Sequence, residues 1–546
     1  MVRNRRLAAV AAALLVVTVA GAAAPREPDV QAGETIYLTG VLPSGARLEG
    51  TQSRVDVRVT GTQAACVNCH QRSGLGTHEG SSLIPAVTSE QLFAPRLPEG
   101  QGMPAAAQRL HGVRQAYTDE TLARAIREGL NPEGHPLDDL MPRFALDDAS
   151  MAALVTYLRQ LTARHPVGLG GGLLHVATIV TPDADPQKRQ GVLDVLKRYV
   201  TEKNASPIKS MPMAHMGGIA HRGDMLVNRR WQLEVWTLNG SPSTWRSQLE
   251  RDYAAQPVFA VLSGVGRAHW APVHEFCEQH AVPCLLPYLE VPVIAEQDFY
   301  PVYFSRGVLL EAQLFAQAII SAATQHPTSV RQVYRHGDSG EQAAAALAAA
   351  LRAKGIQVSS VALPAAVPGH GLDEALSHGS ATAVQVLWLR PADIAALAHV
   401  DAPRTRVYLS GTMGGLENAP VPPTWRAHLA MSYPFELPQR RGVQLDYPLG
   451  WFAFRHIPVV DRQAQSDAFL ACSLLADTLN LMEDHASSAY LVERLQALLE
   501  RRTVTGYYPR LTLATGQRFA SKGGYLVHFA APTGPALVAD TPWTVP

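Results

Sequence analysis

Apolar residues recur at helical spacing in two segments of the first 165 residues. One segment begins at Thr118, a capping hydroxyl, and carries an apolar stripe as far as Gly129. The other begins at Asp147 and continues as an amphipathic helix to residue 161. The segment that follows residues 33–37 is rich in Gly, Thr and Val and is expected to form a small hairpin or loop. The pattern predicts a small all-α domain over residues 25–165.

From residue 173 to residue 546, strand patterns alternate with helix patterns. Strands are predicted at residues 174–180, 231–238, 258–262, 283–286, 330–335, 357–363, 383–389 and 406–409. Helices are predicted at residues 186–201, 243–253, 270–280, 309–325 and 340–354. This alternation is typical of parallel sheets covered by helices on both faces, and its repetition predicts two α/β lobes. The chain end, from residue 507 to residue 529, is expected to add hairpin strands to one lobe.

Two segments without a globular pattern frame these domains. Residues 166–172 are glycine-rich and predict a flexible linker. They lack a third glycine in register and precede a strand, which argues against a dinucleotide fingerprint. At the N-terminus, a basic start, an apolar run and a cluster of small residues predict a signal peptide over residues 1–24, cleaved near Ala22 or Ala23. An uncleaved membrane anchor is the alternative, because the run is near the lower length limit for spanning a bilayer.

Composition narrows the classes of function. A chain of 546 residues is too long for one core, so two or three domains are expected. Lys+Arg and Asp+Glu both number 47, and without a basic run no nucleic-acid partner is expected. The sequence has no Gly-x-Ser-x-Gly elbow or phosphate loop, and His274, Glu275 and His280 have the wrong spacing for a zinc protease. These observations favour a protein without catalytic turnover of its own.

The clearest chemical motif is Cys66-Val67-Asn68-Cys69-His70. Cys-x-x-Cys-His is the attachment signature of a c-type haem, in which two thiols bond to one porphyrin and the adjacent histidine reaches the iron. A redox or zinc Cys-x-x-Cys that happens to precede a histidine is the alternative. The signal peptide favours haem, and a haem motif after an export signal indicates a protein of the periplasm. The sequence therefore predicts one covalent haem c held by Cys66 and Cys69, with His70 as an axial ligand.

Met141-Pro142 lies between the two long predicted helices of the first domain, where it could supply the second axial ligand. A methionine thioether is a soft ligand that favours ferrous iron and is typical of electron carriers. The rivals are Met103, His111 and His135. The motif, Met141 and the terminal helix together resemble class I cytochromes c over about a quarter of the chain, and this resemblance favours Met141.

The remaining cysteines, Cys277, Cys284 and Cys472, are odd in number and cannot all pair. Cys277 and Cys284 flank a predicted helix-to-strand turn, where a disulfide and two buried thiols are both reasonable. Residues 211–216 contain three methionines and a histidine, which are ligand types for Cu(I). A mobile loop is the favoured interpretation of this segment, because it defines no ligand geometry.

Several runs in the α/β region resemble type I periplasmic binding proteins, the family of branched-chain amino-acid receptors. They are residues 256–264, 282–287, 303–307, 334–340 and 408–411. The resemblance implies a small-molecule ligand in a cleft between two lobes, at the carboxyl ends of strands. Carried over by position, the candidate ligand-binding residues are Ser263, Gly264, Ser305, Ser339, Ser410 and Gly411. Each serine or glycine could instead be an ordinary helix cap or turn.

The sequence thus predicts an all-α class I cytochrome c domain followed by a two-lobed α/β binding-protein domain. The first functional hypothesis is an exported electron carrier coupled to ligand binding, with a periplasmic redox partner such as a quinoprotein dehydrogenase. The second is a substrate-binding or sensory receptor in which the haem senses redox state or a gas. The third is a haem enzyme such as a peroxidase, which needs an open iron position.

Overall fold

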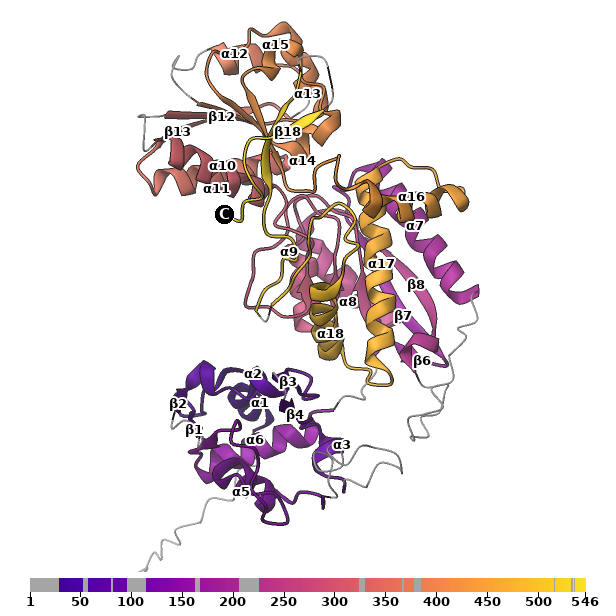
Figure 1. The fold of residues 1–546 in the computed structure, drawn as a ribbon. Coiled ribbons are helices and arrows are strands. Elements are labelled where there is room, and N and C mark those ends of the chain that lie inside the picture. The colour runs from indigo at the N-terminus through magenta and orange to yellow at the C-terminus, as the bar shows by residue number, and fades with distance from the viewer. Residues whose placement is uncertain are drawn as a thin grey trace, which may run out of the picture. The chain divides into compact units, whose positions relative to one another are not determined.

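The computed structural model describes residues 29–52, 57–79, 82–95, 114–162, 167–205, 225–323, 329–365, 368–377, 384–514, 516–531, 534 and 536–546. The predicted signal peptide and the methionine-rich segment 211–216 lie outside these residues. The chain divides into two compact units (Figure 1). The first contains residues up to Cys69, residues 87–96 and residues 113–161, and the second contains residues 70–86 and everything from Thr162 onward apart from the gaps.

The first unit is built around two crossing helices, α1 (Val30–Thr39) and α6 (Asp148–Gln160). Gly33 permits this contact, because a Cβ there would lie 2.1 Å from the carbonyl oxygen of Ala153. Tyr37 packs beside Tyr157 across the crossing, with ring centroids 5.3 Å apart. The predicted helices are confirmed, and the unit also contains α5 (Asp119–Glu128) and α3 (Ser89–Leu92).

The first unit contains more β-structure than the expected all-α domain. The predicted hairpin forms β1 (Glu49–Gln52) and β2 (Val57–Thr60), which pair antiparallel. β5 (Arg143–Phe144) joins the other edge of β1 and completes a three-stranded sheet. A second hairpin, β3 (Thr77–Glu79) with β4 (Ser82–Ile84), follows the haem motif but belongs to the second unit. The sheet ties the segment around Met141 to the insertion that precedes the motif.

The first lobe of the second unit is a sheet in the order β11-β10-β9-β7-β6, with β8 also paired to β7. Its strands are parallel except for β6, and helices α7 (Pro186–Ala205), α8 (Trp245–Ala255) and α9 (Ala271–Gln279) connect them. The strands are β6 (Leu169–Gly170), β7 (Leu173–Val180), β8 (Arg230–Thr237), β9 (Ala260–Leu262), β10 (Cys284–Leu285) and β11 (Pro301–Val302). Residues 169–170 of the expected linker therefore pair with β7 in this sheet.

The second lobe is a sheet in the order β13-β12-β14-β15-β16-β17-β18, parallel up to β16 and antiparallel beyond it. Figure 1 shows α10 (Val308–Ala323) and α11 (Ser339–Arg352) on one side of it, with α12, α13 and α15 on the other. The strands are β12 (Ser329–Arg335), β13 (Gln357–Leu363), β14 (Val384–Trp388), β15 (Val407–Leu409), β16 (Leu429–Tyr433), β17 (Tyr525–Phe529) and β18 (Leu537–Ala539). The shorter helices are α12 (Leu372–Ser377), α13 (Pro391–Ala396), α14 (Gly411–Gly414) and α15 (Pro423–Arg426). The predicted terminal hairpin is β17–β18.

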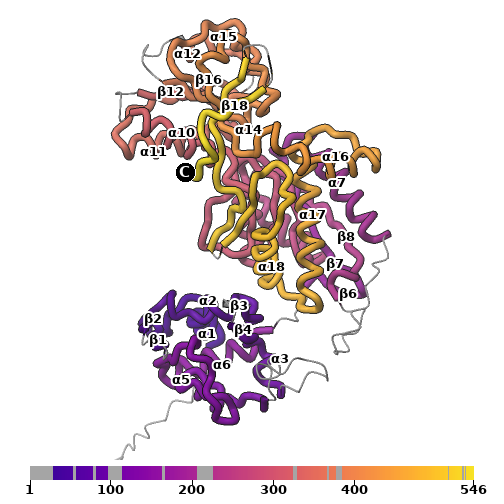
Figure 2. The backbone as a smooth tube through the Cα atoms, in the orientation of Figure 1, coloured from indigo at the N-terminus to yellow at the C-terminus, as the bar shows by residue number. Residues whose placement is uncertain are grey.

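Three segments cross between the lobes, and Figure 2 lets each be followed. Residues 303–307 lead from β11 to α10, residues 434–441 from β16 to α16 (Gly442–Phe454), and residues 502–524 from α18 (Ser488–Arg501) to β17. The first and third are joined by a hydrogen bond of 2.8 Å from Tyr303 N to Arg518 O. The second and third are joined by one of 2.8 Å from Glu436 N to Tyr507 O. The crossings therefore form one hydrogen-bonded bundle.

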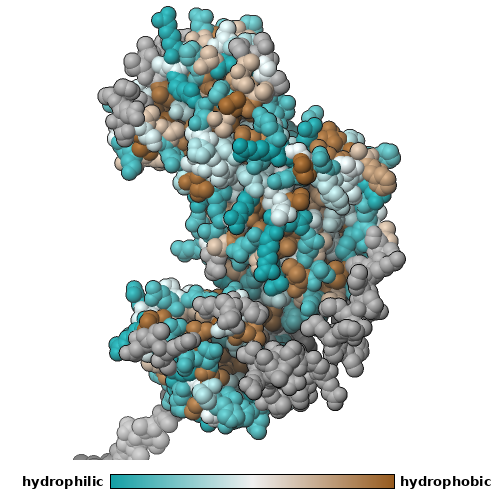
Figure 3. All heavy atoms as spheres, in the orientation of Figure 1, coloured by the Kyte–Doolittle hydropathy of each residue, from teal (hydrophilic) through white to brown (hydrophobic). Residues whose placement is uncertain are grey.

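Three long helices of the first lobe, α16, α17 (Arg462–Met482) and α18, were not predicted. α17 packs against both α7 and α18 and is buried along most of its length. On the face drawn in Figure 3, apolar residues are interspersed with polar ones. Among the described residues, the most exposed large apolar side chains are Val443, Phe454 and Tyr447, all on α16. In the described ranges, no helix is both long and apolar enough to cross a bilayer.

Candidate functional site: a haem-attachment motif and an interlobe pocket

The two cysteines of the motif lie on one helical turn. Helix α2 (Val67–His70) begins directly after Cys66, and Cys69 N donates a 3.2 Å hydrogen bond to Cys66 O. Neither thiol is in a disulfide. Val67 and Cys66 pack against the apolar core of the first unit. A helical turn holds both sulfurs close enough to bond to the same porphyrin.

The imidazole of His70 is oriented by the backbone. Its Nδ1 lies 3.0 Å from the carbonyl oxygen of Pro85, so Nε2 is the nitrogen left for coordination. Gly76 N donates a 3.0 Å hydrogen bond to His70 O and closes the glycine-rich turn. Gly76 has φ +72°, and a Cβ there would lie 2.1 Å from Ile84 O. The turn therefore brings two backbone segments together beside the histidine, as a haem-edge turn must.

Met141 is positioned through backbone contacts on both sides. Gln52 Nε2, from β1, donates a 3.1 Å hydrogen bond to Leu140 O, and the Arg143 guanidinium donates to Met141 O. The Met141 side chain is partly buried against the same core cluster that Cys66 contacts. Its rival His135 is exposed, and the rivals Met103 and His111 lie outside the described residues. Met141 thus remains the predicted second ligand.

These residues fit a c-type haem better than a zinc site. A structural zinc needs four nitrogen, sulfur or oxygen ligands in one cluster. In the described parts of the chain, the one group of His, Cys, Asp and Glu close enough to hold a metal is Glu483, Asp484 and His485, which includes neither motif cysteine. Two thiols on a helical turn, followed at once by an oriented imidazole, are the donor set that covalent haem requires.

The remaining cysteines lie in the second unit. Cys277, Cys284 and Cys472 are all buried and are all free thiols. Burial raises the pKa of Cys277 and Cys472, so both are kept protonated. Of the two alternatives that the sequence left open for Cys277 and Cys284, the structure has the buried thiols.

The predicted cleft residues all follow strands, but the structure gives them different surroundings. Ser339 Oγ donates a 2.6 Å hydrogen bond to Glu290, and Ser410 Oγ donates to Glu311 and caps α14. Gly411 lies against backbone, since a Cβ there would be 1.9 Å from Ser432 O. Ser263 and Gly264 form the turn after β9, both with positive φ. Only Ser305 among the six lines the pocket that the lobes enclose.

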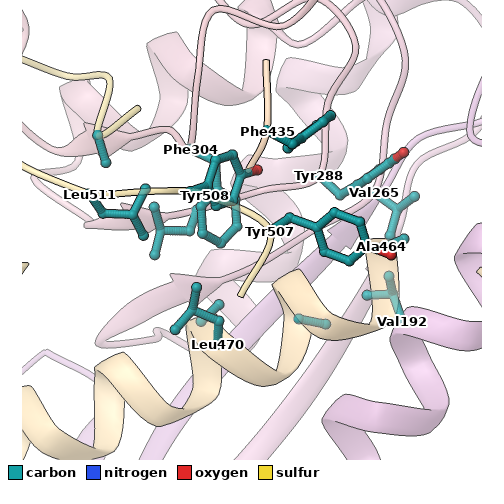
Figure 4. Packing of buried hydrophobic residues seen from close by; sticks show 14 of the residues in the cluster. Val192, Val265, Tyr288, Phe304, Phe435, Ala464, Leu470, Tyr507, Tyr508 and Leu511 are labelled. Atoms are coloured by element: carbon teal, nitrogen blue, oxygen red, sulfur yellow. The ribbon is translucent and has the colours of Figure 1, made fainter. Parts of the chain in front are cut away.

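That pocket lies where the three crossings meet, and Figure 4 shows part of its aromatic wall. Phe304 stacks on Tyr508 with ring centroids 5.1 Å apart, and Phe435 lies 5.4 Å from the same Tyr508 ring. Its lining comes from the loop after β10, from all three crossings, from α14 and from α17: Pro287, Tyr288, Leu289, Pro292, Tyr303, Phe304, Ser305, Gly307, Thr412, Phe435, Gln463, Asp467 and Tyr508. Residues distant in sequence thus build one small, aromatic site.

Two hydrogen-bonded systems hold the tyrosines of this wall. The Tyr303 hydroxyl lies 2.6 Å from His274 Nδ1, and His274 Nε2 lies 2.6 Å from Asp298. On the other side, Lys188 Nζ donates a 2.9 Å hydrogen bond to the Tyr288 hydroxyl. Burial raises the pKa of Tyr288 to about 12, although the charge of Lys188 opposes this. Both phenols are therefore neutral and fixed in orientation.

Asp467 is the one carboxylate among the residues that line the pocket. Its side chain is buried, and Tyr508 donates a 3.2 Å hydrogen bond to its Oδ2. Its Oδ1 has no hydrogen-bond partner among the described residues. Burial raises the pKa of Asp467 well above its usual value, and hydrogen bonds from Tyr508 and Gln463 only partly offset this. No local sequence signal marked this residue, because it lies in the buried face of α17.

A second buried carboxylate joins the two lobes. Glu290 follows β10 of the first lobe, and Arg390 follows β14 of the second. Arg390 donates to both oxygens of Glu290, at 2.8 and 2.6 Å, and to both oxygens of Asp338, at 2.8 and 2.6 Å. Burial raises the pKa of Glu290, but the hydrogen bonds and charge of Arg390 outweigh it and lower the value to about 2. We call this set, Glu290, Asp338 and Arg390, the interlobe latch.

Residues 60–162 match the family model for Cytochrome c. No relative of the chain is found among curated proteins. The chain resembles the structure of a branched-chain amino-acid ABC transporter protein from Thermus thermophilus with bound valine, at 9% identity and a TM-score of 0.49, covering 69% of this chain and 98% of that one. It also resembles a fatty acid ABC transporter substrate-binding protein from Thermomonospora curvata, at 12% identity and a TM-score of 0.47, covering 70% and 95%.

A third similar structure is a substrate-binding periplasmic protein from Ralstonia solanacearum, at 14% identity and a TM-score of 0.47, covering 67% of this chain and all of that one. At such identities a likeness concerns the fold alone. The α/β unit itself has two sheet-based lobes joined by three crossings, the two-lobed α/β architecture that the sequence predicted. The chain thus combines a segment that matches the Cytochrome c family model, residues 60–162, with a two-lobed α/β unit.

Proposed function

We propose that this protein is an exported electron carrier with one covalent haem c, joined to a receptor domain that binds a small molecule between its lobes. The observation that carries the proposal is the motif itself: two thiols on one helical turn, neither in a disulfide, followed by an imidazole that Pro85 orients. The pocket at the crossings supports the receptor part. The signal peptide supports export to the periplasm.

In this proposal Cys66 and Cys69 would hold the haem through their thiols, and His70 and Met141 would be the protein ligands of its iron. Bound in this way, a haem supplies a one-electron couple, and methionine ligation favours the ferrous state. Pro85 keeps His70 in one ring orientation and raises the electron density on its coordinating nitrogen. The hydrogen bond from Gln52 to Leu140 holds the Met141 segment in place. With both residues as ligands, the chain would carry electrons and would offer no iron position to a substrate.

The partner we propose is a periplasmic dehydrogenase, of which a quinoprotein is one case. It would reduce the cytochrome domain while the receptor domain reports a small molecule. Because both domains share one chain, we propose that ligand binding and redox state are coupled. Ligand affinity measured on the ferric and the ferrous protein tests this, and equal affinities would refute the coupling.

Carbon monoxide binding tests the electron-carrier role directly. The purified full chain is reduced with dithionite, exposed to carbon monoxide and examined by visible spectroscopy. An unchanged spectrum is expected, because two protein ligands leave no position for the gas. Ready binding would exclude stable ligation by Met141 and would favour a gas sensor or a peroxidase.

A further inference from the structure

The interlobe pocket has a charge and a shape that select among ligands. Thirteen residues line it, and they include one carboxylate, Asp467, and no lysine or arginine. The Asp467 side chain lines the pocket and is 2% exposed, and no described residue donates a hydrogen bond to its Oδ1. A buried carboxylate oxygen without a donor is costly, and burial alone favours the neutral form of this carboxyl. A ligand that is both a cation and a hydrogen-bond donor supplies Oδ1 with a partner and favours the ionised form.

The charged residues near the pocket do not give it a positive electrostatic potential. Lys188, behind Tyr288, lies 3.8 Å from Asp461 and is held by the Tyr288 hydroxyl. Asp461 precedes α17 and adds negative potential at Asp467. Arg390 is satisfied by the two other carboxylates of the interlobe latch. A ligand carboxylate would meet Asp467 without a free cation to receive it, so the site disfavours free amino acids and other organic acids.

The aromatic side chains of the pocket wall also restrict which ligands can bind. Phe304, Phe435 and Tyr508 pack face to face or tilted around the pocket, and Tyr288 closes another side. The negative faces of aromatic rings attract cations, and cages of such rings are used to bind alkylated ammonium groups. The cavity measures about 30 Å³, room for about two water-sized groups. A cation of only a few heavy atoms fits this space.

We propose that the interlobe pocket binds a small alkylammonium cation, whose N–H groups donate to Asp467 Oδ1 while the aromatic side chains surround its carbon atoms. This inference rests on the proposed receptor role and specifies its ligand class. Ser305 and Thr412 line the same pocket and supply hydroxyl groups beside the cation. The ligand enters when the lobes part, because the crossings that line the pocket also connect the lobes.

The test is isothermal titration of the full haem-loaded chain with four probes: methylammonium, methanol as its neutral counterpart, acetate and valine. Methylammonium should bind, and methanol, acetate and valine should not. Asp467→Asn keeps the shape and removes the charge, so it should weaken methylammonium binding at least about ten-fold, the value of a hydrogen bond to a charged group. Asp477→Asn is the matched control, since Asp477 lies farther along α17 in a pair with Arg502 outside the pocket.

The outcomes separate the inference from the receptor role. Binding of acetate or valine without methylammonium would overturn the ligand class and leave the receptor role standing. Failure of all four probes to bind the wild-type protein would overturn the ligand class, and a thermal-shift screen of other neutral molecules would then test the receptor role. Equal affinity of the wild type and Asp467→Asn would also overturn the inference. Asp467→Asn should unfold at a Tm no lower than that of the wild type, which confirms that the variant pocket is folded.

Discussion

The interlobe latch makes a strong prediction about stability. Arg390→Met removes four hydrogen bonds from buried Glu290 and half-buried Asp338 and, among the described residues, leaves them only the longer ion pairs with Arg267, at 4.0 and 3.8 Å. The pKa of Glu290 lies at about 2, about 2.5 below its ordinary value, and its side chain is 6% exposed. At about 1.4 kcal/mol per unit, the folded state favours ionised Glu290 by about 3 kcal/mol. Breaking a buried pair by removing one partner has a similar cost, about 3–5 kcal/mol.

The assay is thermal unfolding of the α/β unit followed by far-ultraviolet circular dichroism. A unit of this size has an unfolding entropy of about 0.8 kcal/mol/K, so Arg390→Met should lower Tm by about 4 °C at neutral pH. Because folding lowers the pKa of Glu290, the stabilisation of the folded state by ionised Glu290 is complete above about pH 4.3 and is lost as the pH falls towards 2. The difference between wild type and variant should therefore shrink over that interval.

Two further variants control this experiment. Arg406→Met removes an exposed arginine from its pair with Asp540, and it should lower Tm by less than 1 °C, because exposed pairs contribute little. In the double variant Glu290→Gln/Arg390→Met, part of the lost stability should return, because one uncompensated charge is gone. A Tm for Arg390→Met within 1 °C of wild type, or a deficit that persists unchanged at pH 2, would refute the reasoning.

Three more outcomes follow from single contacts. Met141→Ala should open the iron, so that the reduced variant binds carbon monoxide in the visible spectrum and the wild type does not. Gly33→Ala should destabilise the cytochrome domain by about 1–3 kcal/mol, because the added methyl group would lie 2.1 Å from Ala153 O. The measurement is the midpoint of urea unfolding, followed by the haem absorbance. Gly170→Ala should leave the urea midpoint of the cytochrome domain unchanged, because a Cβ at Gly170 meets nothing within 4 Å. Asp467→Asn should raise Tm at neutral pH but not near pH 3, because burial raises the pKa of Asp467 and its ionisation opposes folding above about pH 3.9.

Local chemistry explains which features the sequence could predict. Cys66, Cys69 and His70 lie within five residues of one another, so the sequence alone predicts their chemistry. Thr118 and Gly129 cap α5 as expected, since capping depends on a few adjacent residues. The strand of residues 174–180 is likewise visible as a buried β-branched run.

Long-range contacts explain what the sequence could not predict. Asp467 and Gln465 are polar residues in a helix that is buried nearly all round, so α17 shows no clean apolar stripe. The pocket is lined by Tyr288, Phe435 and Tyr508, which are far apart in sequence and become neighbours only where the crossings meet. Ser339 and Ser410 lie near the expected edge, but buried glutamates take up their hydroxyl groups, and spacing alone does not reveal such pairs.

The bundle of three crossings is also the place where the two lobes can hinge. Ser305, Phe435 and Tyr508 each belong to a different crossing and all face the pocket, so a ligand there sits almost on the axis of any hinge motion. A displacement of a fraction of an ångström at that axis becomes a much larger sweep at the outer ends of the lobes.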